Sequence, residues 1–180
     1  MSETARQGDR TAPAARGQAP HKQFHEYAAV TATPWPEVRL GISVQDEAIT
    51  SIDFLPGYSE EVAATSHLTR EVLRQLQNYF RDPRQSFDLL LAPPGTPFQQ
   101  RVWNALQQIP AGATRSYGEL ARQLGSSARA VGGACRANPI PVIIPCHRVV
   151  AAQGIGGFMG MTAGHGLRIK HHLLVHESFL

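Results

Sequence analysis

A Pro-Pro-Gly run at residues 93–95 divides the chain into a stretch with the composition of strands and a stretch with the composition of helices. Neither kind of element continues easily through two prolines and a glycine, so the run predicts a domain boundary. We expect a disordered tail over residues 1–21, an N-terminal α/β domain over 22–92 and a second domain over 95–180. The tail lacks the apolar residues whose burial would offset the entropy lost on ordering. Its arginines could contact nucleic acid, although a solvated tail is the simpler interpretation.

The N-terminal domain shows two kinds of periodicity. Short runs in which apolar and polar residues alternate predict three antiparallel strands, at residues 24–30, 38–44 and 49–55. Apolar residues then recur every four positions, which predicts a helix with one buried face, at Leu68, Val72, Leu76 and Phe80. Residues 87–91 predict a further short strand. This part of the chain shows no cluster of residues with catalytic potential.

Capping boxes mark two helix starts in the second domain. A Ser or Thr is followed three residues later by Gln or Glu, in Thr96 with Gln99 and in Ser116 with Glu119. Gly125 predicts the end of the second helix, only two turns on. Trp103 lies beside the apolar face of the first helix, so we expect a core residue; the alternative is a platform on which a base stacks.

A third helix is predicted over residues 128–137. Its arginines and glycines are spaced i, i+3, i+4 and i+7 and therefore share one face: Arg129, Gly132, Gly133 and Arg136. A glycine costs a helix up to about 1 kcal/mol relative to alanine, so this pair indicates a backbone that approaches a partner closely. Together with the preceding helix it predicts a helix-turn-helix whose second helix enters a groove of DNA. The alternative is helix packing through the glycines, with the arginines in solvent.

Residues 145–150, Pro-Cys-His-Arg-Val-Val, place a candidate thiolate, Cys146, beside a candidate base, His147. The apolar, β-branched residues 142–144 come directly before, so we expect the cysteine to be buried. Burial alone raises the pKa of a thiol, whereas a neighbouring imidazole stabilises the thiolate that acts as nucleophile. The alternative is a buried cysteine that packs as a small apolar residue beside an unrelated histidine.

Composition restricts the partners. The formal net charge of +3 and the pI near 9.2 allow an acidic partner, and no apolar run approaches the roughly 20 residues that span a bilayer. No signal peptide is evident, so we expect a cytoplasmic protein whose two cysteines, Cys135 and Cys146, are reduced, although they could in principle pair. Cys135 is a small buried residue or, alternatively, a sensor of oxidation. The histidines near the C-terminus lack the spacing of a metal site, so we expect solvated helix positions, at His165, His171, His172 and His176.

In order along the chain, these motifs resemble the DNA alkyltransferases that remove alkyl groups from O6 of guanine. The resemblance covers residues 95–178, and Pro-Cys-His-Arg-Val is among its most specific parts. It implies an α/β N-terminal domain, an antiparallel sheet with a helix, that is like ribonuclease H in topology. It also implies a mostly α C-terminal domain with a winged-helix-like helix-turn-helix. The implied partner is double-stranded DNA that contains O6-alkylguanine, and we expect a monomer without cofactor, metal or membrane contact.

The resemblance also assigns roles to single residues. Cys146 would accept the alkyl group, His147 would activate it through a water, Glu177 would orient the imidazole, Asn138 would hold the turn and Tyr117 would donate to the leaving guanine. Arg129 would fill the space of a flipped guanine, and further DNA contacts would come from Ser116, Gly132, Gly133 and Arg136. The alkylguanine pocket would be formed by Pro141, Val149, Phe158, Met159 and Gly160. Such a transfer yields a thioether, so each molecule would act once.

Two features depart from the family pattern. The turn between Gly125 and Arg129 is shorter than usual, and residues 158–161, Phe-Met-Gly-Met, stand where the family carries Tyr-Ser-Gly-Gly or Tyr-Ala-Gly-Gly. The flexible Met159 in place of a small residue predicts that bulkier alkyl groups are admitted.

Three other functions remain open at this stage: recognition of damaged DNA without transfer, DNA-binding regulation, and hydrolysis by a Cys-His pair. Cys146 argues against the first, because such relatives usually carry Trp in its place. A role as a DNA-binding regulator does not explain the presence of Pro-Cys-His-Arg-Val together with Glu177. A hydrolase needs an oxyanion hole that the sequence does not reveal.

Overall fold

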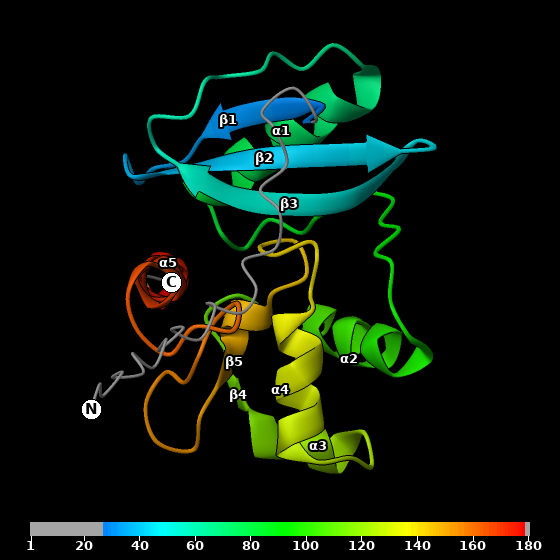
Figure 1. Ribbon diagram of the computed structural model, residues 1–180, viewed down its shortest axis with the longest axis vertical. Coiled ribbons are helices and arrows are strands. Elements are labelled where there is room, and N and C mark those ends of the chain that lie inside the picture. Colours follow the sequence, from blue (N-terminus) through cyan, green and yellow to red (C-terminus); the bar gives the residue numbers. More distant parts are fainter. Residues whose placement is uncertain (1–26, 179–180) are drawn as a thin grey trace, which may run out of the picture.

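The computed structural model describes residues 27–178, so the predicted tail and the first residues of the first predicted strand lie outside the described part. A three-stranded sheet and one helix form the N-terminal part, which lies above a helical C-terminal part in Figure 1. The N-terminal elements are β1 (Ala29–Ala32), β2 (Val38–Gln45), β3 (Ala48–Pro56) and α1 (His67–Arg81). The prediction of three antiparallel strands and a following helix is confirmed.

The sheet has the order β1-β2-β3, with β2 and β3 joined by a two-residue turn. Asp46 and Glu47 form that turn with φ of 49° and 59°, as the twist of a tight hairpin requires. Leu40 and Ile42 of β2 are fully buried in the same apolar cluster as Val72 and Leu76 of α1. The helix therefore packs on the sheet through the face that its four-residue repeat predicted.

The predicted strand over residues 87–91 is wrong. Only a single bridge joins this segment to the sheet, between Ile49 and Leu91. The side chain of Gln75 in α1 accepts from the Asp88 backbone N–H at 2.8 Å and donates to the Asp88 carbonyl at 2.9 Å. The bridge consists of two hydrogen bonds, from the Ile49 N–H to the Leu90 carbonyl at 3.0 Å and from the Ala92 N–H to the Ile49 carbonyl at 2.9 Å. The backbone of Asp88 is satisfied by Gln75 and takes no part in the ladder.

Four helices form most of the C-terminal part: α2 (Pro97–Gln107), α3 (Tyr117–Gln123), α4 (Ala128–Arg136) and α5 (His165–Ser178). Both predicted capping boxes are present, at Thr96 and at Ser116. Gly125 follows α3 with a φ of 60°, a conformation that favours glycine and ends the helix there.

One apolar cluster runs from the sheet into the helices. The Ile52 N–H of β3 donates to the Pro139 carbonyl at 2.8 Å, so the sheet is also tied by a backbone hydrogen bond to the segment that leads to Cys146. Trp103 is buried, and its indole N–H donates to the Ala134 carbonyl of α4 at 2.9 Å. The prediction that Trp103 is a core residue is confirmed.

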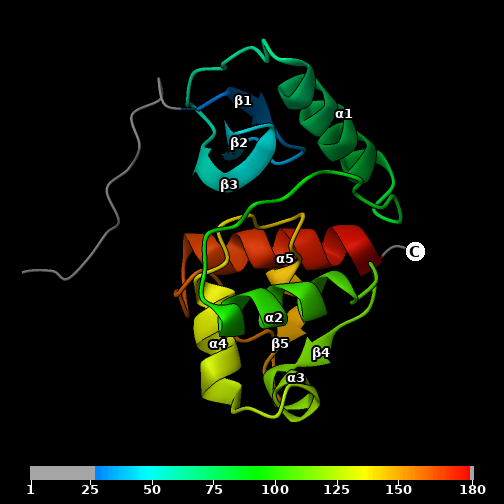
Figure 2. The same cartoon turned by 90° about the vertical axis from the view of Figure 1, so that its right-hand side faces the viewer.

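Helix α5 runs along the side of the C-terminal part that faces the sheet and α1 (Figure 2). Two of its histidines are therefore not solvated as expected. His172 stacks on Trp35 with ring centroids 5.2 Å apart and bonds the Glu37 carboxylate at 2.8 Å, while His176 bonds the Tyr79 carbonyl at 3.0 Å. The sequence of α5 does not reveal which of its faces meets the N-terminal part.

Within residues 27–178, no helix combines the length and the apolar character needed to cross a bilayer. The same residues bring together no group of three or more histidine, cysteine or acidic side chains that could hold a metal ion.

We expect Trp103→Phe to lower the free energy of unfolding by about 1–3 kcal/mol, because the buried Ala134 carbonyl loses this donor. Urea denaturation followed by circular dichroism measures the change. Tyr58→Phe, at an exposed position, is the control and should leave stability unchanged. If Trp103→Phe left stability unchanged and weakened DNA binding, the alternative role of Trp103, a platform on which a base stacks, would be favoured instead.

Candidate active site

The turn before Cys146 is buried and strained. Val142 has a φ of 74°, a conformation that is costly for a β-branched residue, by about 1–3 kcal/mol. The side chain of Asn138 holds the turn at both ends, because it accepts from the Ile140 N–H at 3.0 Å and donates to the Ile144 carbonyl at 2.8 Å. This clamp fixes the position from which Cys146 enters the site.

Cys146 begins a single helical turn, η2 (Cys146–Arg148), which leads into the short strand β5 (Val149–Val150). β5 pairs in parallel with β4 (Arg115–Ser116), the two residues directly before α3. This ladder fixes Tyr117, the first residue of α3, beside the segment that carries Cys146.

The carboxylate of Glu177, on α5, is the most heavily bonded group of the site. Its Oε1 lies 2.8 Å from the His147 Nε2 and accepts from the Tyr79 hydroxyl at 2.8 Å. Arg148 donates to it from Nε and from a terminal nitrogen, at 2.8–3.2 Å, and also donates to the Ile109 carbonyl. Glu177 therefore joins α1, η2 and α5 at one buried point.

These contacts fix the ionisation of the pair. Burial opposes ionisation of Glu177, but the hydrogen bonds from His147 and Arg148 outweigh it and lower the pKa of the carboxyl group to about 2. A carboxylate only accepts, so the proton of His147 lies on Nε2. Burial lowers the pKa of His147 and outweighs the hydrogen bond and charge of Glu177, which raise it, so the ring is neutral. Its Nδ1 is a free base, buried and without a hydrogen-bond partner among the described residues.

The thiol of Cys146 is buried, and burial raises its pKa to about 11 despite a hydrogen bond with Asn138 and the charge of Lys170. The raising effect of burial thus outweighs the stabilisation of a thiolate, and in the free protein Cys146 is a thiol. Its activation requires a base.

Lys170 is fully buried on α5, two turns before Glu177. Its ammonium donates to the Val149 carbonyl at 2.6 Å and to the Gly157 carbonyl at 3.0 Å, which joins the two ends of the loop after Cys146. Burial lowers the pKa of Lys170 to about 8. Close to neutral pH it still supplies positive charge beside Cys146.

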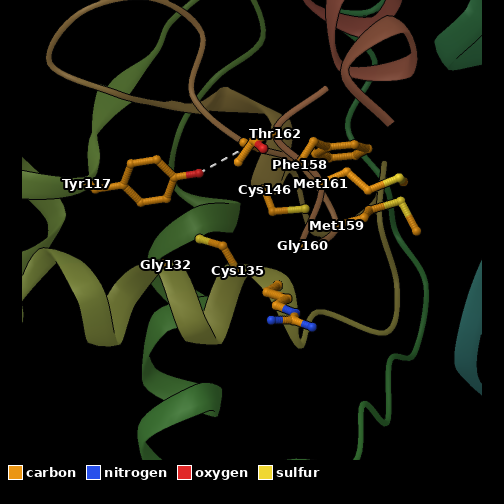
Figure 3. Close-up of a pocket in the computed structure, with 11 residues that line it drawn as sticks. Tyr117, Gly132, Cys135, Cys146, Phe158, Met159, Gly160, Met161 and Thr162 are labelled. Atoms are coloured by element: carbon orange, nitrogen blue, oxygen red, sulfur yellow. Dashed lines mark hydrogen bonds between the residues drawn. The ribbon is translucent and has the colours of Figure 1, made fainter. Parts of the chain in front are cut away.

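A cavity of about 160 Å³ opens at Cys146, between α3, α4 and the loop after β5 (Figure 3). It is lined by Tyr117, Gly132, Cys135, Arg136, Cys146, Gly157, Phe158, Met159, Gly160, Met161 and Thr162. The Tyr117 hydroxyl donates to the Gly157 carbonyl at 3.3 Å. Burial, together with the two cysteines, raises the pKa of Tyr117 to about 12, so the phenol keeps its proton as a donor.

A tight turn forms one wall of this cavity. Phe158 and Met161 exchange two backbone hydrogen bonds of 2.9 Å, and the residues between them, Met159 and Gly160, have φ of 52° and 78°. Two positive φ values in succession define a turn that normally takes Asn or Gly, so Met159 adds local strain. Gly160 is required there for a second reason, because a Cβ would lie 2.6 Å from the Arg136 side chain.

Helix α4 presents Arg129 and Arg136 to solvent. Of its two glycines, Gly133 is exposed and Gly132 is half-buried. A Cβ on Gly133 would meet nothing within 4 Å, and one on Gly132 would lie 3.9 Å from the Tyr117 ring. Gly133 therefore does not serve helix packing, the alternative considered from the sequence. The open backbone at Gly133 leaves room for a partner.

The structure brings seven of the fifteen predicted residues together in the lining of the cavity: Tyr117, Gly132, Arg136, Cys146, Phe158, Met159 and Gly160. Val149 and Pro141 are buried outside its lining, and the Ser116 hydroxyl caps α3 by accepting from the Glu119 N–H at 3.1 Å. Sequence reasoning missed Tyr79, Arg148 and Lys170 as members of the site. Lys170 could have been found, because a lysine seven residues before Glu177 lies on the same, buried helix face.

Comparisons with known proteins identify the family of the chain. Residues 97–179 match the family model described as the DNA-binding domain of 6-O-methylguanine DNA methyltransferase. The methylated-DNA–protein-cysteine methyltransferase of Methanosarcina acetivorans is 43% identical over 141 residues, which cover 74% of this chain and 87% of that protein. Among solved structures, the O6-methylguanine methyltransferase of Mycobacterium tuberculosis has a TM-score of 0.65 at 36% identity, covering 83% of this chain and 92% of the other.

A second Mycobacterium tuberculosis structure, solved in complex with DNA, also has a TM-score of 0.65, at 37% identity over 84% of this chain and 91% of that one. Identity at this level over most of both proteins places the chain in one family. The span of the family model, residues 97–179, contains Cys146, His147 and Glu177. The protein belongs to the methylated-DNA–protein-cysteine methyltransferases.

Proposed function

We propose that this protein repairs DNA by moving the alkyl group of O6-alkylguanine irreversibly onto Cys146. The observation that carries the proposal is the buried thiol at the floor of a base-sized cavity, beside a neutral histidine whose free nitrogen can take its proton. The names of the relatives point to the same reaction.

Proton transfer would come first. Because the Cys146 thiol is protonated in the free protein and the His147 Nδ1 carries no proton, the thiol proton passes to Nδ1, through a water if one lies between them. The carboxylate of Glu177 stabilises the imidazolium that forms, as in other nucleophile–histidine–carboxylate sites. Arg148 already neutralises the charge of Glu177, so a second positive charge on His147 is unfavourable. The imidazolium therefore persists only while the substrate is being attacked.

The sulfur of Cys146 then attacks the alkyl carbon. A carbon–sulfur bond forms, the carbon–O6 bond breaks, and its electron pair leaves with guanine. The phenol of Tyr117 offers the departing base a hydrogen bond, since its raised pKa keeps it protonated. A thioether has no easy route back to a thiol, so each molecule acts once. No cofactor enters this sequence.

The DNA would lie against α4. Arg129 is exposed in the first turn of this helix and Arg136 reaches the rim of the cavity, so the helix offers positive charge and an open backbone at Gly133 beside the pocket. A base can reach Cys146 only after leaving the stack, at a cost of a few kcal/mol. We propose that Arg129 occupies the space that the base leaves.

The finer description of the fold belongs to the same proposal. The division near residues 93–95 would separate a ribonuclease H-like unit, with α1 packed on the sheet, from a winged-helix-like unit in which α3 and α4 form the helix-turn-helix. The protein would act as a monomer in the cytoplasm, where its two free cysteines stay reduced.

Cys146→Ala should abolish alkyl transfer and retain binding to duplex DNA, because the change removes the nucleophile and little surface. Transfer is measured with a labelled O6-methylguanine duplex, and binding by fluorescence anisotropy. If binding disappears together with transfer while circular dichroism is unchanged, Cys146 contributes to the DNA interface rather than to the chemistry alone.

Arg129→Ala should slow transfer from duplex DNA by roughly tenfold or more. The reason is that the flipped base would lose a little over 1 kcal/mol of stabilisation, and about 1.4 kcal/mol corresponds to a tenfold change in rate. Reaction with free O6-benzylguanine should change little, since a free base needs no extrusion. Arg70→Ala, at an exposed site on α1, is the control. An equal loss of transfer rate with both substrates would show that Arg129 does not occupy the space that the base leaves.

Met159→Ala should lower the benzyl-to-methyl ratio of transfer rates by about 2- to 10-fold, the range of a sulfur–aromatic contact. The reason is that Met159 lines the cavity with a flexible side chain that is 39% exposed. Single-turnover kinetics with both adducts measure the ratio, with Leu90→Ala as a distant control. Comparable rates for both adducts that do not respond to Met159→Ala would show that this side chain does not select for size.

A further inference from the structure

The cavity contains a second thiol that alkyl transfer does not use. Cys135 of α4 and Cys146 of η2 both line it, with side chains 8% and 4% exposed. In Figure 3 the two side chains enter from facing backbones, Cys135 from the helix below and Cys146 from the segment above. Both are free cysteines.

The backbones that carry the two thiols belong to one rigid framework. The Asn138 N–H donates to the Cys135 carbonyl at 3.3 Å, and the Asn138 side chain donates to the Ile144 carbonyl, two residues before Cys146. Trp103 fixes the end of α4 through the Ala134 carbonyl. The two thiols are therefore held beside the same cavity.

Both thiols keep their protons in the resting cavity. Burial, and after it negative charge on Cys146, raise the pKa of Cys135 to about 12, while the charge of Lys170 opposes the rise. The sulfenic acid that oxidation of Cys146 produces is neutral, so it does not oppose ionisation of Cys135 when that thiol attacks. Lys170 remains beside both sulfurs to stabilise the attacking thiolate.

We propose that Cys135 and Cys146 form one dithiol site that accepts a peroxide and closes reversibly as a disulfide. Cys146 passes its thiol proton to the His147 Nδ1, and its sulfur attacks the peroxide. The oxygen–oxygen bond breaks, sulfenic acid forms on Cys146, and the leaving hydroxide takes that proton and departs as water. The sulfur of Cys135 then attacks the sulfenic sulfur, the sulfur–oxygen bond breaks, and a second water leaves as the disulfide forms. Two thiols are oxidised and one peroxide is reduced.

This pairing has a consequence for a protein that acts once. A sulfinic acid at the acceptor would be permanent, whereas a disulfide returns to two thiols when a dithiol reductant attacks it. Cys135 would therefore preserve the alkyl acceptor under oxidative stress, at the cost of closing the pocket meanwhile. The shared cavity and the two free thiols support the pairing, and only its value for repair rests on the proposed function.

The test uses the full chain, treated with hydrogen peroxide, blocked with N-ethylmaleimide and digested with trypsin without reduction. Cleavage after Arg129, Arg136 and Arg148 separates the cysteines into peptides 130–136 and 137–148. We expect these peptides to be joined, with the loss of two hydrogens. Alkyl transfer by the treated protein should be lost and then largely restored by dithiothreitol.

Two variants sharpen the result. In Cys135→Ala the joined peptide should be absent, and most of the activity lost to peroxide should stay lost after dithiothreitol, each relative to the untreated variant. Leu90→Ala, at an exposed position outside the cavity, should behave as the natural chain does. Dithiothreitol does not reduce methionine sulfoxide, so the recovery reports on the thiols.

Cysteines that are oxidised separately, with no joined peptide, would overturn the proposal, as would equal recovery of the natural chain and Cys135→Ala. A joined peptide in a protein that never accepts an alkyl group would support the dithiol site and contradict the proposed function, so the two failures are distinguishable.

Discussion

The buried carboxylate of Glu177 is the contact on which the rest of the site depends. It accepts hydrogen bonds from Tyr79 of α1 and from His147 and Arg148 of η2, while it is itself part of α5. Removing one partner of a buried ion pair costs about 3–5 kcal/mol, because the other charge is left uncompensated. The same carboxylate therefore fixes the tautomer of His147 and anchors the N-terminal part of the molecule to the active site.

That arrangement keeps Cys146, the nucleophile of the proposed mechanism, protonated until it reacts. Burial holds Cys146 as a thiol and His147 as a neutral base, and Arg148 opposes a second positive charge beside it. A thiolate that formed permanently in a pocket with a second thiol would be exposed to oxidation. In the proposed mechanism the thiol loses its proton only as its sulfur attacks, which reconciles a reactive residue with a protein that acts once.

The sequence predicted the parts that local rules control. Capping boxes located α2 and α3, the four-residue repeat located α1, and the apolar run before Cys146 located a buried cysteine. The predicted strand over 87–91 is reduced to one bridge, because the Gln75 side chain bonds the backbone of Asp88. Tyr79 and His172 were missed because their partners lie about a hundred residues away or more, and no local pattern encodes which faces meet. The cavity residues came from a resemblance, and their roles remain predictions.

Mass spectrometry tests the central claim most directly: transfer of an alkyl group to Cys146. The protein is incubated with a duplex that contains one O6-methylguanine and is then reduced and digested with trypsin. We predict one added methylene on peptide 137–148, which contains Cys146, and none on peptide 130–136, which contains Cys135. An unmodified peptide 137–148 from protein that still binds the duplex would contradict the account and favour a protein that recognises damage without repairing it.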